Sequence, residues 1–179
     1  MSLLKKEIRP AYVILILSVV FLTLFAWALW PRRPSTDGLF RSICFGNLKQ
    51  LALVHQMYSE DHDGRAMPAA KWQSSLMPYV KNENSFRCPE AVKEFGANSF
   101  GYAFNMNLDM TPFSSQDKPE RVICFFETNS LGENIAGGSA IMARPGRHNR
   151  RGGFAYLDGH GTMVRDGDDP GSWTLNPTR

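Results

Sequence analysis

The chain has 179 residues, 43% of them hydrophobic, and its 20 Lys and Arg against 17 Asp and Glu give a formal net charge of +3. Residues 1–35 contain five basic residues and one acidic residue, so residues 36–179 carry a net charge of −1. This balance excludes an electrostatic case for nucleic-acid binding by the larger part of the chain.

Residues 11–30 form an apolar run that contains neither a charged residue nor a proline. A helix of this length rises about 30 Å, which matches the hydrocarbon core of a bilayer. Tyr12 near one end and Trp27 and Trp30 at the other are placed as interfacial aromatic residues are. The run therefore predicts a single membrane-spanning helix, with membrane lipid as its partner.

A cleaved secretory signal is the alternative for the same run, because a basic segment precedes it and Ala26-Trp27-Ala28 matches a cleavage site. The apolar run continues to Trp30 without a polar region, which favours an anchor. Basic residues flank both sides equally, so charge does not decide the orientation; they are Lys5, Lys6 and Arg9 before the run and Arg32, Arg33 and Arg41 after it. A short head before a large body favours a cytoplasmic amino end and an extracytoplasmic body.

Pro31 and Pro34 interrupt the chain after this run, since proline is rare inside helices. They divide it into residues 1–34, with the head, the membrane helix and the break, and residues 35–179. Ser35, Thr36 or Asp37 can cap a new helix. Apolar residues recur at helical spacing over residues 39–58, and Gly64 predicts the end of this amphipathic helix.

A shorter helix is predicted at residues 71–77 and a loop at residues 81–100, which are rich in Asn, Glu and Ser. Strands are predicted at residues 101–106, 121–126, 153–157 and 161–165, with a long loop over residues 127–146 and an irregular tail from residue 166. Asp158-Gly159 predicts a hairpin turn between the last two strands. Helices first and strands later predict an α+β body, with a small antiparallel sheet packed on the long helix.

His148 precedes the Asp158-Gly159 turn by ten positions, and His160 follows it. This spacing resembles the His-x9-Asp-Gly signature of a family of bacterial pilin-like proteins. Five further blocks resemble the same family in order: Cys44-Phe-Gly-Asn47-Leu48-Lys49-Gln50-Leu51, the stretch from Tyr58 through Asp61, Asp63 and Gly64 to Pro68, residues 76–82, Phe86-Arg87-Cys88-Pro89, and residues 101–108. Six blocks in one order are far more specific than any one of them.

The resemblance implies a type IV pilin-like fold: one long amino-terminal helix with a membrane part and an amphipathic outer part, the latter packed on a small antiparallel sheet. It also implies a relation to the major pseudopilin of type II secretion. The expected function is therefore that of a structural component of a type II secretion or type IV pilus-related system in the bacterial inner membrane. Its expected partners are other pseudopilin or envelope proteins, including copies of itself.

The head of the chain departs from the family pattern. Family members start with a prepilin peptidase site, in which a glycine precedes the apolar run and a glutamate lies within it. Here no glycine precedes the run and no glutamate lies inside it. The alternative function is therefore a non-polymerising envelope binding module with a pilin-like body, either anchored or secreted.

Cys44 and Cys88 lie in two of the matching blocks, and an extracytoplasmic body would permit a disulfide between them. Spacing does not establish proximity, so a disulfide is favoured over two free thiols but both alternatives stay open. Cys124, within Val-Ile-Cys-Phe-Phe, is predicted to be a buried apolar residue.

The residues most able to bind a metal are Asp61, Asp63, His148, Asp158 and His160, with calcium favouring the aspartates and zinc the histidines. Structural roles are preferred for all of them. Asp61 and Asp63 would end the helix, Asp158 would form the hairpin turn, and His148 would hydrogen-bond across the base of the hairpin. No cofactor is expected, with calcium as the alternative.

Four arginines within eight residues, Arg144, Arg147, Arg150 and Arg151, are interpreted as a solvated loop balanced by nearby aspartates rather than as an anion-binding patch. The serines lie in no nucleophile motif, and no glycine-rich phosphate loop occurs. Catalysis is therefore not predicted.

Overall fold

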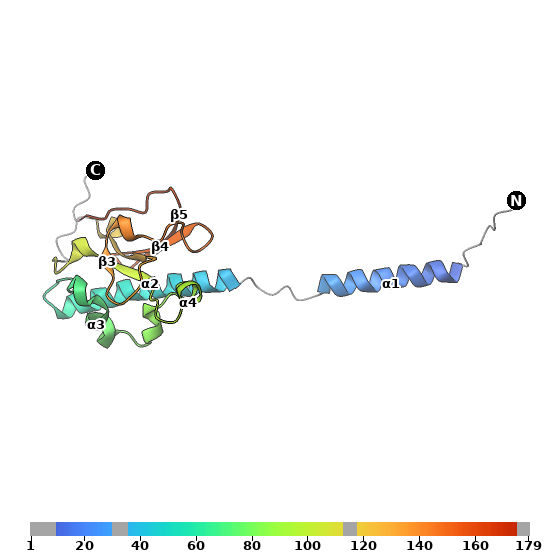
Figure 1. Cartoon of the computed structure of the whole chain (residues 1–179), viewed down its shortest axis with the longest axis horizontal. Helices are drawn as coiled ribbons and strands as arrows, with labels where there is room; N and C mark the ends of the chain where they lie inside the picture. Colours follow the sequence, from blue (N-terminus) through green and yellow to red (C-terminus); the bar gives the residue numbers. More distant parts are fainter. Residues whose placement is uncertain (1–9, 30–35, 113–117, 175–179) are drawn as a thin grey trace. The chain divides into compact units, whose positions relative to one another are not determined.

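The computed structural model of the chain describes residues 10–29, 36–112 and 118–174. The chain divides into two compact units, residues 1–34 and residues 35–179 (Figure 1). The predictions made for the basic head, for Trp30, for the break at residues 31–34 and for a cap at Ser35 lie outside the described residues.

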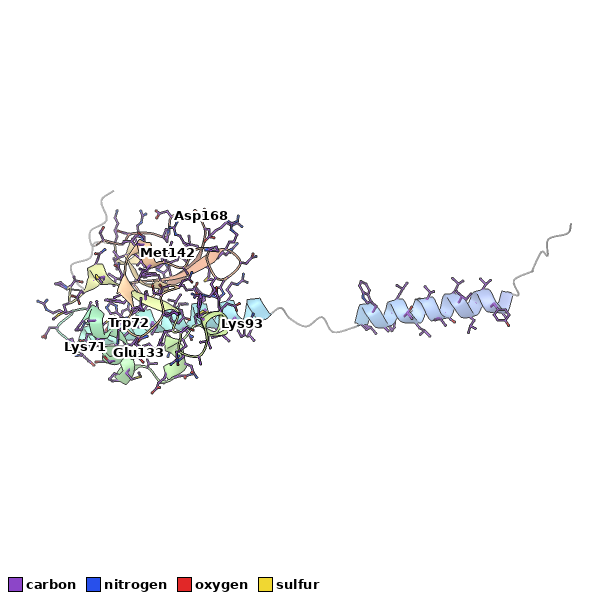
Figure 2. The ribbon with its side chains drawn as sticks, in the orientation of Figure 1. Lys71, Trp72, Lys93, Glu133, Met142 and Asp168 are labelled. Atoms are coloured by element: carbon purple, nitrogen blue, oxygen red, sulfur yellow. A yellow bond between two sulfur atoms is a disulfide. The ribbon has the colours of Figure 1, made fainter. Side chains whose placement is uncertain are left out.

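The first unit contains helix α1 (Pro10–Leu29). Its segment Ala11–Leu29 has a mean hydropathy of 2.6, and none of this segment is buried. Apolar side chains project from all sides of the helix, with exposures from 44% at Val13 to 73% at Trp27 (Figure 2). The Ser18 and Thr23 hydroxyls donate to carbonyls within the helix. The chain thus has a helix that is long and apolar enough to cross a membrane, as predicted.

The second unit combines helices with one five-stranded sheet. Its α-helices are α2 (Thr36–Asp61), α3 (Trp72–Leu76) and α4 (Pro89–Phe95). Its strands are β1 (Tyr102–Asn105), β2 (Ile123–Glu127), β3 (Ala136–Gly137), β4 (Arg151–Tyr156) and β5 (Gly161–Arg165). Short 3-10 helices connect them: η1 (Ala69–Lys71), η2 (Met77–Tyr79), η3 (Glu83–Phe86), η4 (Met106–Leu108), η6 (Pro119–Arg121) and η7 (Ser139–Ile141).

The strand order is β3-β1-β2-β4-β5. The pairs β1–β2, β2–β4 and β4–β5 are antiparallel, whereas β3 pairs with β1 in parallel. The α+β class is therefore confirmed in its coarse form, but a wholly antiparallel sheet is wrong. The difference arises in the predicted loop at residues 127–146, which returns along β1 so that Phe104 N–H donates to the Ile135 carbonyl.

Helix α2 packs on one face of the sheet, against β2, β4 and β5, and also contacts α3 and α4. Figure 1 shows α2 between the sheet and α3. Trp72 and Phe125 are fully buried in the core on this side. The opposite face buries Phe126 and Phe154 against Trp173 from the carboxyl-terminal segment. Residues 166–174 of that segment contain neither helix nor strand, as predicted for the tail, and Trp173 packs on this face of the sheet.

The predicted hairpin is present between β4 and β5. Gly159 adopts a φ of +88°, and its N–H donates to the Tyr156 carbonyl. The Asp158 carboxylate accepts from the backbone N–H of His160 at 3.1 Å and lies 2.6 Å from its Nδ1. Asp-Gly therefore forms the turn because the glycine adopts the left-handed backbone and the aspartate carboxylate accepts the neighbouring N–H.

The loop predicted at residues 81–100 instead contains η3 and α4. Pro89 occupies the first turn of α4, and Gly96, at a φ of +95°, ends the helix. Both residues are typical of these positions. The helix buries only Ala91 completely, so it lacks the apolar stripe by which longer helices are recognised in a sequence.

His55 of α2 provides a pH-dependent contribution to stability. Its ring is fully buried, with centroids 5.8 Å from Phe104 and 6.0 Å from Phe125. Burial lowers its pKa from 6.5 to about 4. Between these pH values the unfolded chain binds the proton and the folded chain does not. The contribution of His55 to the free energy of unfolding is therefore fully present above pH 6.5 and is lost as the pH drops towards 4. The expected loss is about 3 kcal/mol over this window.

This prediction is checked by urea unfolding of the full chain in detergent at pH 7.5 and 4.5. The variant His55→Leu should lose less stability than the wild type between the two pH values, because its neutral side chain takes up no proton. His62→Gln, which alters an exposed histidine at the end of α2, serves as the control. An equal loss in wild type and His55→Leu would show that other groups cause the acid sensitivity.

Candidate functional site

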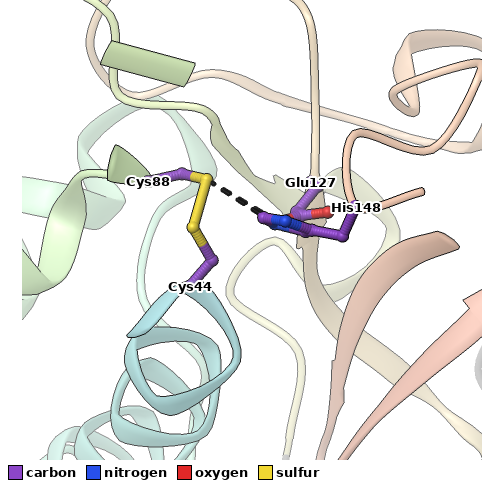
Figure 3. Close-up of side chains that lie close together, drawn as sticks. All are labelled: Cys44, Cys88, Glu127 and His148. Atoms are coloured by element: carbon purple, nitrogen blue, oxygen red, sulfur yellow. Dashed lines mark hydrogen bonds and ion pairs between the residues drawn. A yellow bond between two sulfur atoms is a disulfide. The ribbon is translucent and has the colours of Figure 1, made fainter. Parts of the chain in front are cut away.

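Four side chains from separate segments meet in the interior beside α2 (Figure 3). All are buried, with exposures of 0% for both cysteines, 1% for the glutamate and 4% for the histidine. Their sulfur, carboxylate and imidazole atoms all lie within 4.8 Å of one another. We call this group the buried tetrad; its members are Cys44, Cys88, Glu127 and His148.

Cys44 and Cys88 form a disulfide, with their Cα atoms 5.0 Å apart and the two residues separated by 44 positions in the chain. Of the two alternatives left open by the sequence, the structure contains the disulfide. Cys44 belongs to α2, while Cys88 caps the amino end of α4 and donates its N–H to the Phe100 carbonyl at 2.7 Å. The bond therefore ties the long helix to the segment that leads into β1.

Tyr102 forms a hydrogen bond to the backbone of one of the two disulfide-bonded cysteines. Its buried hydroxyl donates to the Cys44 carbonyl at 3.1 Å. Burial, together with the nearby charge of Glu127, raises the pKa of Tyr102 well above its ordinary value of 10.0. The hydroxyl therefore stays protonated and remains a donor.

Two glycines allow the close approach on which the site depends. A Cβ on Gly101, whose φ is +83°, would lie 2.5 Å from Ala91 Cβ and 3.0 Å from Cys88 Cβ. A Cβ on Gly153 would lie 2.5 Å from Leu48 Cδ1. Larger residues at these two positions would push β1 and β4 away from the helices.

Glu127, at the end of β2, is held by two partners. The His148 Nε2 lies 2.7 Å from its Oε1, and the Gly153 N–H donates to its Oε2 at 2.9 Å. Because a carboxylate only accepts hydrogen bonds, Nε2 carries the proton that His148 donates. The pair is thus a buried, hydrogen-bonded link between β2 and the segment before β4.

The predicted bond of His148 across the base of the hairpin is wrong. Asn149 and Arg150 have φ values of +53° and +59°, so the backbone turns sharply between His148 and β4. This turn directs the imidazole to the end of β2 instead of along the hairpin. The histidine was recognised in the sequence, but its partner Glu127 was not.

The tetrad's geometry does not suit nucleophilic catalysis. The Cys88 sulfur lies 3.9 Å from His148 Nε2, the same nitrogen that contacts Glu127. An activated thiol needs a base whose second nitrogen is held by the orienting group. The sulfur is also already bonded to Cys44 and has no proton to transfer. What the group offers chemically is a covalent link and a set of metal-ligating atoms.

The polar residues of the first family block join α2 to the segment around η3. Asn47 donates to the Arg87 carbonyl at 2.9 Å, and Gln50 accepts from the Ser85 hydroxyl at 2.7 Å. Leu48 is fully buried, whereas Lys49 is exposed with its ammonium 5.7 Å from the Phe45 ring. Two separate blocks of the resemblance thus contact each other directly.

The remaining motif residues shape turns. Asp63 and Gly64 have φ values of +54° and +71° after the end of α2, as a helix-ending turn requires. Pro68 precedes η1, and its carbonyl accepts from Lys71 N–H at 3.0 Å. Pro89 begins α4.

Of the predicted metal candidates, only His148 belongs to the tetrad. Among residues 10–29, 36–112 and 118–174, the tetrad is the one group in which three or more metal-ligating side chains lie close together. The Asp61 carboxylate accepts from the Tyr79 hydroxyl at 2.9 Å. Asp158 and His160 contact each other in the hairpin turn. Glu127 could have been noticed as a charged residue that directly follows an apolar strand.

Arg147 differs from the solvated loop predicted for the arginine-rich stretch. Its side chain is only 3% exposed, and its guanidinium donates to the Thr128 carbonyl at 2.7 Å and to Asn129 Oδ1 at 2.8 Å. Its Nε lies 3.5 Å from a Glu94 carboxylate oxygen, an ion pair that lacks hydrogen-bond geometry. Arg150, by contrast, is exposed and pairs with Asp166 at 3.6 Å, which fits the prediction.

Comparison of the chain with protein-family models, curated proteins and solved structures gives no match. The resemblance to pilin-like proteins therefore remains a prediction from the motif blocks.

Proposed function

We propose that this chain is a membrane-anchored, pseudopilin-like structural component of a type II secretion or type IV pilus-related system. The observation that carries the proposal is α1, whose apolar surface is exposed all round. A helix of this kind is stable only when lipid or other apolar helices cover it. In this proposal α1 lies in the bacterial inner membrane, and the body faces the extracytoplasmic side.

The body supports the same proposal. A 26-residue helix lies against a sheet, which is the arrangement that the resemblance implies for the outer half of a pilin-like helix. The disulfide suits an oxidising compartment outside the cytoplasm. The tetrad's geometry offers no aligned nucleophile and base, so a structural role is favoured over an enzymatic one.

An exposed apolar stripe on α2 offers a surface for a second copy of the chain. Leu39, Ile43, Leu53 and Met57 are 60%, 39%, 51% and 49% exposed. At about 100° per residue they lie within an arc of about 80° on one side of the helix. Gly46 and Gln50 lie in the same arc, so the stripe carries no charge. Like chains anchored in one membrane would present such stripes to each other.

Cysteine crosslinking tests the assembly. Single cysteines are placed one at a time at positions 14–25 and at Ile43, in a chain that carries Cys124→Ala and keeps the native disulfide. We expect disulfide-linked dimers in the membrane fraction, with a maximum every three to four residues along α1 because one helix face is shared. Glu83→Cys, at an exposed position of the body, should give no dimer.

Charges on the stripe provide the second arm of this test. Ile43→Glu with Met57→Glu should reduce the crosslinked dimer at least about tenfold, since an interface would bury unpaired carboxylates. If the chain stays in the membrane fraction but no position gives a homodimer, the non-polymerising binding module is the better account, which the absence of a glutamate in the apolar run also favours. A soluble chain whose amino end is Leu29 would replace the anchor with a cleaved signal.

A further inference from the structure

The buried tetrad has the composition of a metal centre, and once reduction breaks the bond between the two sulfur atoms its ligand atoms can reach the spacing of one. Zinc sites in proteins are tetrahedral, with Zn–S distances of about 2.3 Å and Zn–N or Zn–O distances of about 2.0–2.2 Å. Ligand atoms in such a site lie about 3.3–3.8 Å from each other. The Cys88 sulfur lies 3.9 Å from His148 Nε2 and 3.8 Å from Glu127 Oε1. The imidazole and the carboxylate, 2.7 Å apart, need to separate by about 1 Å or less.

We propose that the tetrad binds one zinc ion whenever the disulfide is reduced, so that this cluster alternates between a covalent cross-link and a four-ligand metal centre. Two thiolates, one imidazole and one carboxylate form a donor set that zinc accepts, and thiolates select against magnesium and calcium. The ligands come from α2, the start of α4, the end of β2 and the segment before β4. The metal would therefore hold the same segments together as the disulfide does.

The surroundings already orient one of the ligands, Glu127. The Gly153 N–H donates to Glu127 Oε2, which leaves Oε1 for the metal. A centre with two thiolates and one carboxylate around Zn²⁺ carries a net charge of −1. Gly101 lies between Cys88 and Arg147, since a Cβ there would be 3.0 Å from Cys88 Cβ and 3.4 Å from an Arg147 terminal nitrogen. This nitrogen forms no hydrogen bond, and the guanidinium to which it belongs pairs through Nε with Glu94 at 3.5 Å, so a cation that is already ion-paired lies beside the site.

A dithiol can supply the electrons and protons that convert the disulfide form of the tetrad into the form that binds zinc. The dithiol passes two electrons and two protons to the disulfide and becomes a disulfide itself, leaving Cys44 and Cys88 as thiols. Zinc then binds the two thiolates, and their two protons leave for solvent. The neutral imidazole of His148 gives up its hydrogen bond to Glu127 and shifts its proton from Nε2 to Nδ1, and Nε2 then binds the metal. The disulfide form of the same reagent reverses both steps: it takes two electrons from the two thiolates and two protons from solvent, the Cys44–Cys88 bond forms again, and the ion is released. This inference does not depend on the proposed function.

The experiment uses the full chain in detergent, either oxidised or reduced with a dithiol that is then removed without oxygen. Cobalt(II) and zinc are added to each form. The reduced chain should bind one metal ion per chain by elemental analysis, and its cobalt complex should show the sulfur-to-metal charge-transfer absorption of a thiolate site. The oxidised chain should bind none. Zinc should also protect Cys44 and Cys88 of the reduced chain from alkylation.

Variants separate the tetrad from other thiols. His148→Gln and Glu127→Gln should each lower the zinc affinity of the reduced chain at least about 100-fold. Cys44→Ser with Cys88→Ser should abolish the charge-transfer absorption. Cys124→Ala, which removes a buried cysteine outside the tetrad, should leave both measurements unchanged.

Several results would overturn the proposal. These are a folded, reduced wild-type chain without bound cobalt, equal binding by the oxidised chain, or retained binding in the double serine variant. If the reduced chain unfolds without metal, tryptophan fluorescence is followed as zinc is added. Recovery of the folded signal in wild type but not in His148→Gln would support the site, and no recovery in wild type would count against it.

Discussion

Replacing both Cys44 and Cys88 with alanine should lower the free energy of unfolding of the body by about 4 kcal/mol. The disulfide closes a loop over a separation of 44 residues, and a closed loop of that length removes this much entropy from the unfolded chain. Both sulfur atoms are buried, so the alanines also leave small cavities. Urea unfolding of the full chain in detergent, followed by tryptophan fluorescence with a chelator present, measures the loss.

The matched control is Cys124→Ala. It removes one buried sulfur, whose partner is the Ala155 carbonyl at 3.2 Å, but no covalent bond. We expect a loss of about 1–2 kcal/mol, which corresponds to a small cavity. Reduction of the wild-type chain under the same conditions should match the double alanine variant to within about 1 kcal/mol. Equal losses for the control and the double variant would mean that packing of the sulfur atoms, and not the cross-link, stabilises the body.

Local patterns predicted the elements that depend mainly on local physics. The apolar run of α1 and the amphipathic spacing of α2 are visible along the chain. The hairpin turn at Asp158-Gly159 depends on these two residues and not on what packs against the hairpin. In contrast, β3 has only two residues and exists because the chain passes along the open edge of β1. No periodicity can appear in two residues, so this strand and the parallel pairing could not be predicted.

Only those parts of the site that belong to local sequence patterns could be predicted. The two cysteines and His148 stood in recognisable blocks, but Glu127 followed the strand Ile-Cys-Phe-Phe as the first residue of an expected loop. Its burial depends on Gly153, which lacks a side chain and donates its N–H to the carboxylate. A contact between positions 127 and 148 depends on the tertiary fold, and no local rule places them together.

The structure also explains the spacing between His148 and Asp158-Gly159. These positions lie at opposite ends of β4, with the histidine anchoring the strand's beginning to Glu127 and the turn reversing its end into β5. A ten-residue spacing thus corresponds to one strand and its two attachments. A structural role therefore accounts for the His-x9-Asp-Gly spacing while the Cys44–Cys88 disulfide is present, without catalysis or a bound ligand.

Breaking the buried pair should be costly from either side. Glu127→Ala leaves His148 and the Gly153 N–H without their acceptor, and His148→Ala leaves a buried carboxylate without the imidazole. Leaving a buried charge without its partner costs about 3–5 kcal/mol, and leaving two buried donors without their acceptor costs a similar amount at about 1–3 kcal/mol each. We therefore expect each variant, with the disulfide intact, to be destabilised by that amount at pH 7.5, measured by the same urea unfolding.

The double variant distinguishes a specific pair from two independent packing losses. Once one partner is absent, removing the other no longer creates an unpaired group, so the double variant should be more stable than the sum of the single losses predicts, by about 1–3 kcal/mol. Ser85→Ala with Gln50→Ala, which removes a neutral hydrogen bond of 2.7 Å elsewhere along α2, provides the comparison and should show a smaller coupling of about 1 kcal/mol. If the losses in free energy of unfolding at Glu127 and His148 are additive, the two side chains fill space without stabilising each other. The disulfide alone would then hold the segments of the tetrad together.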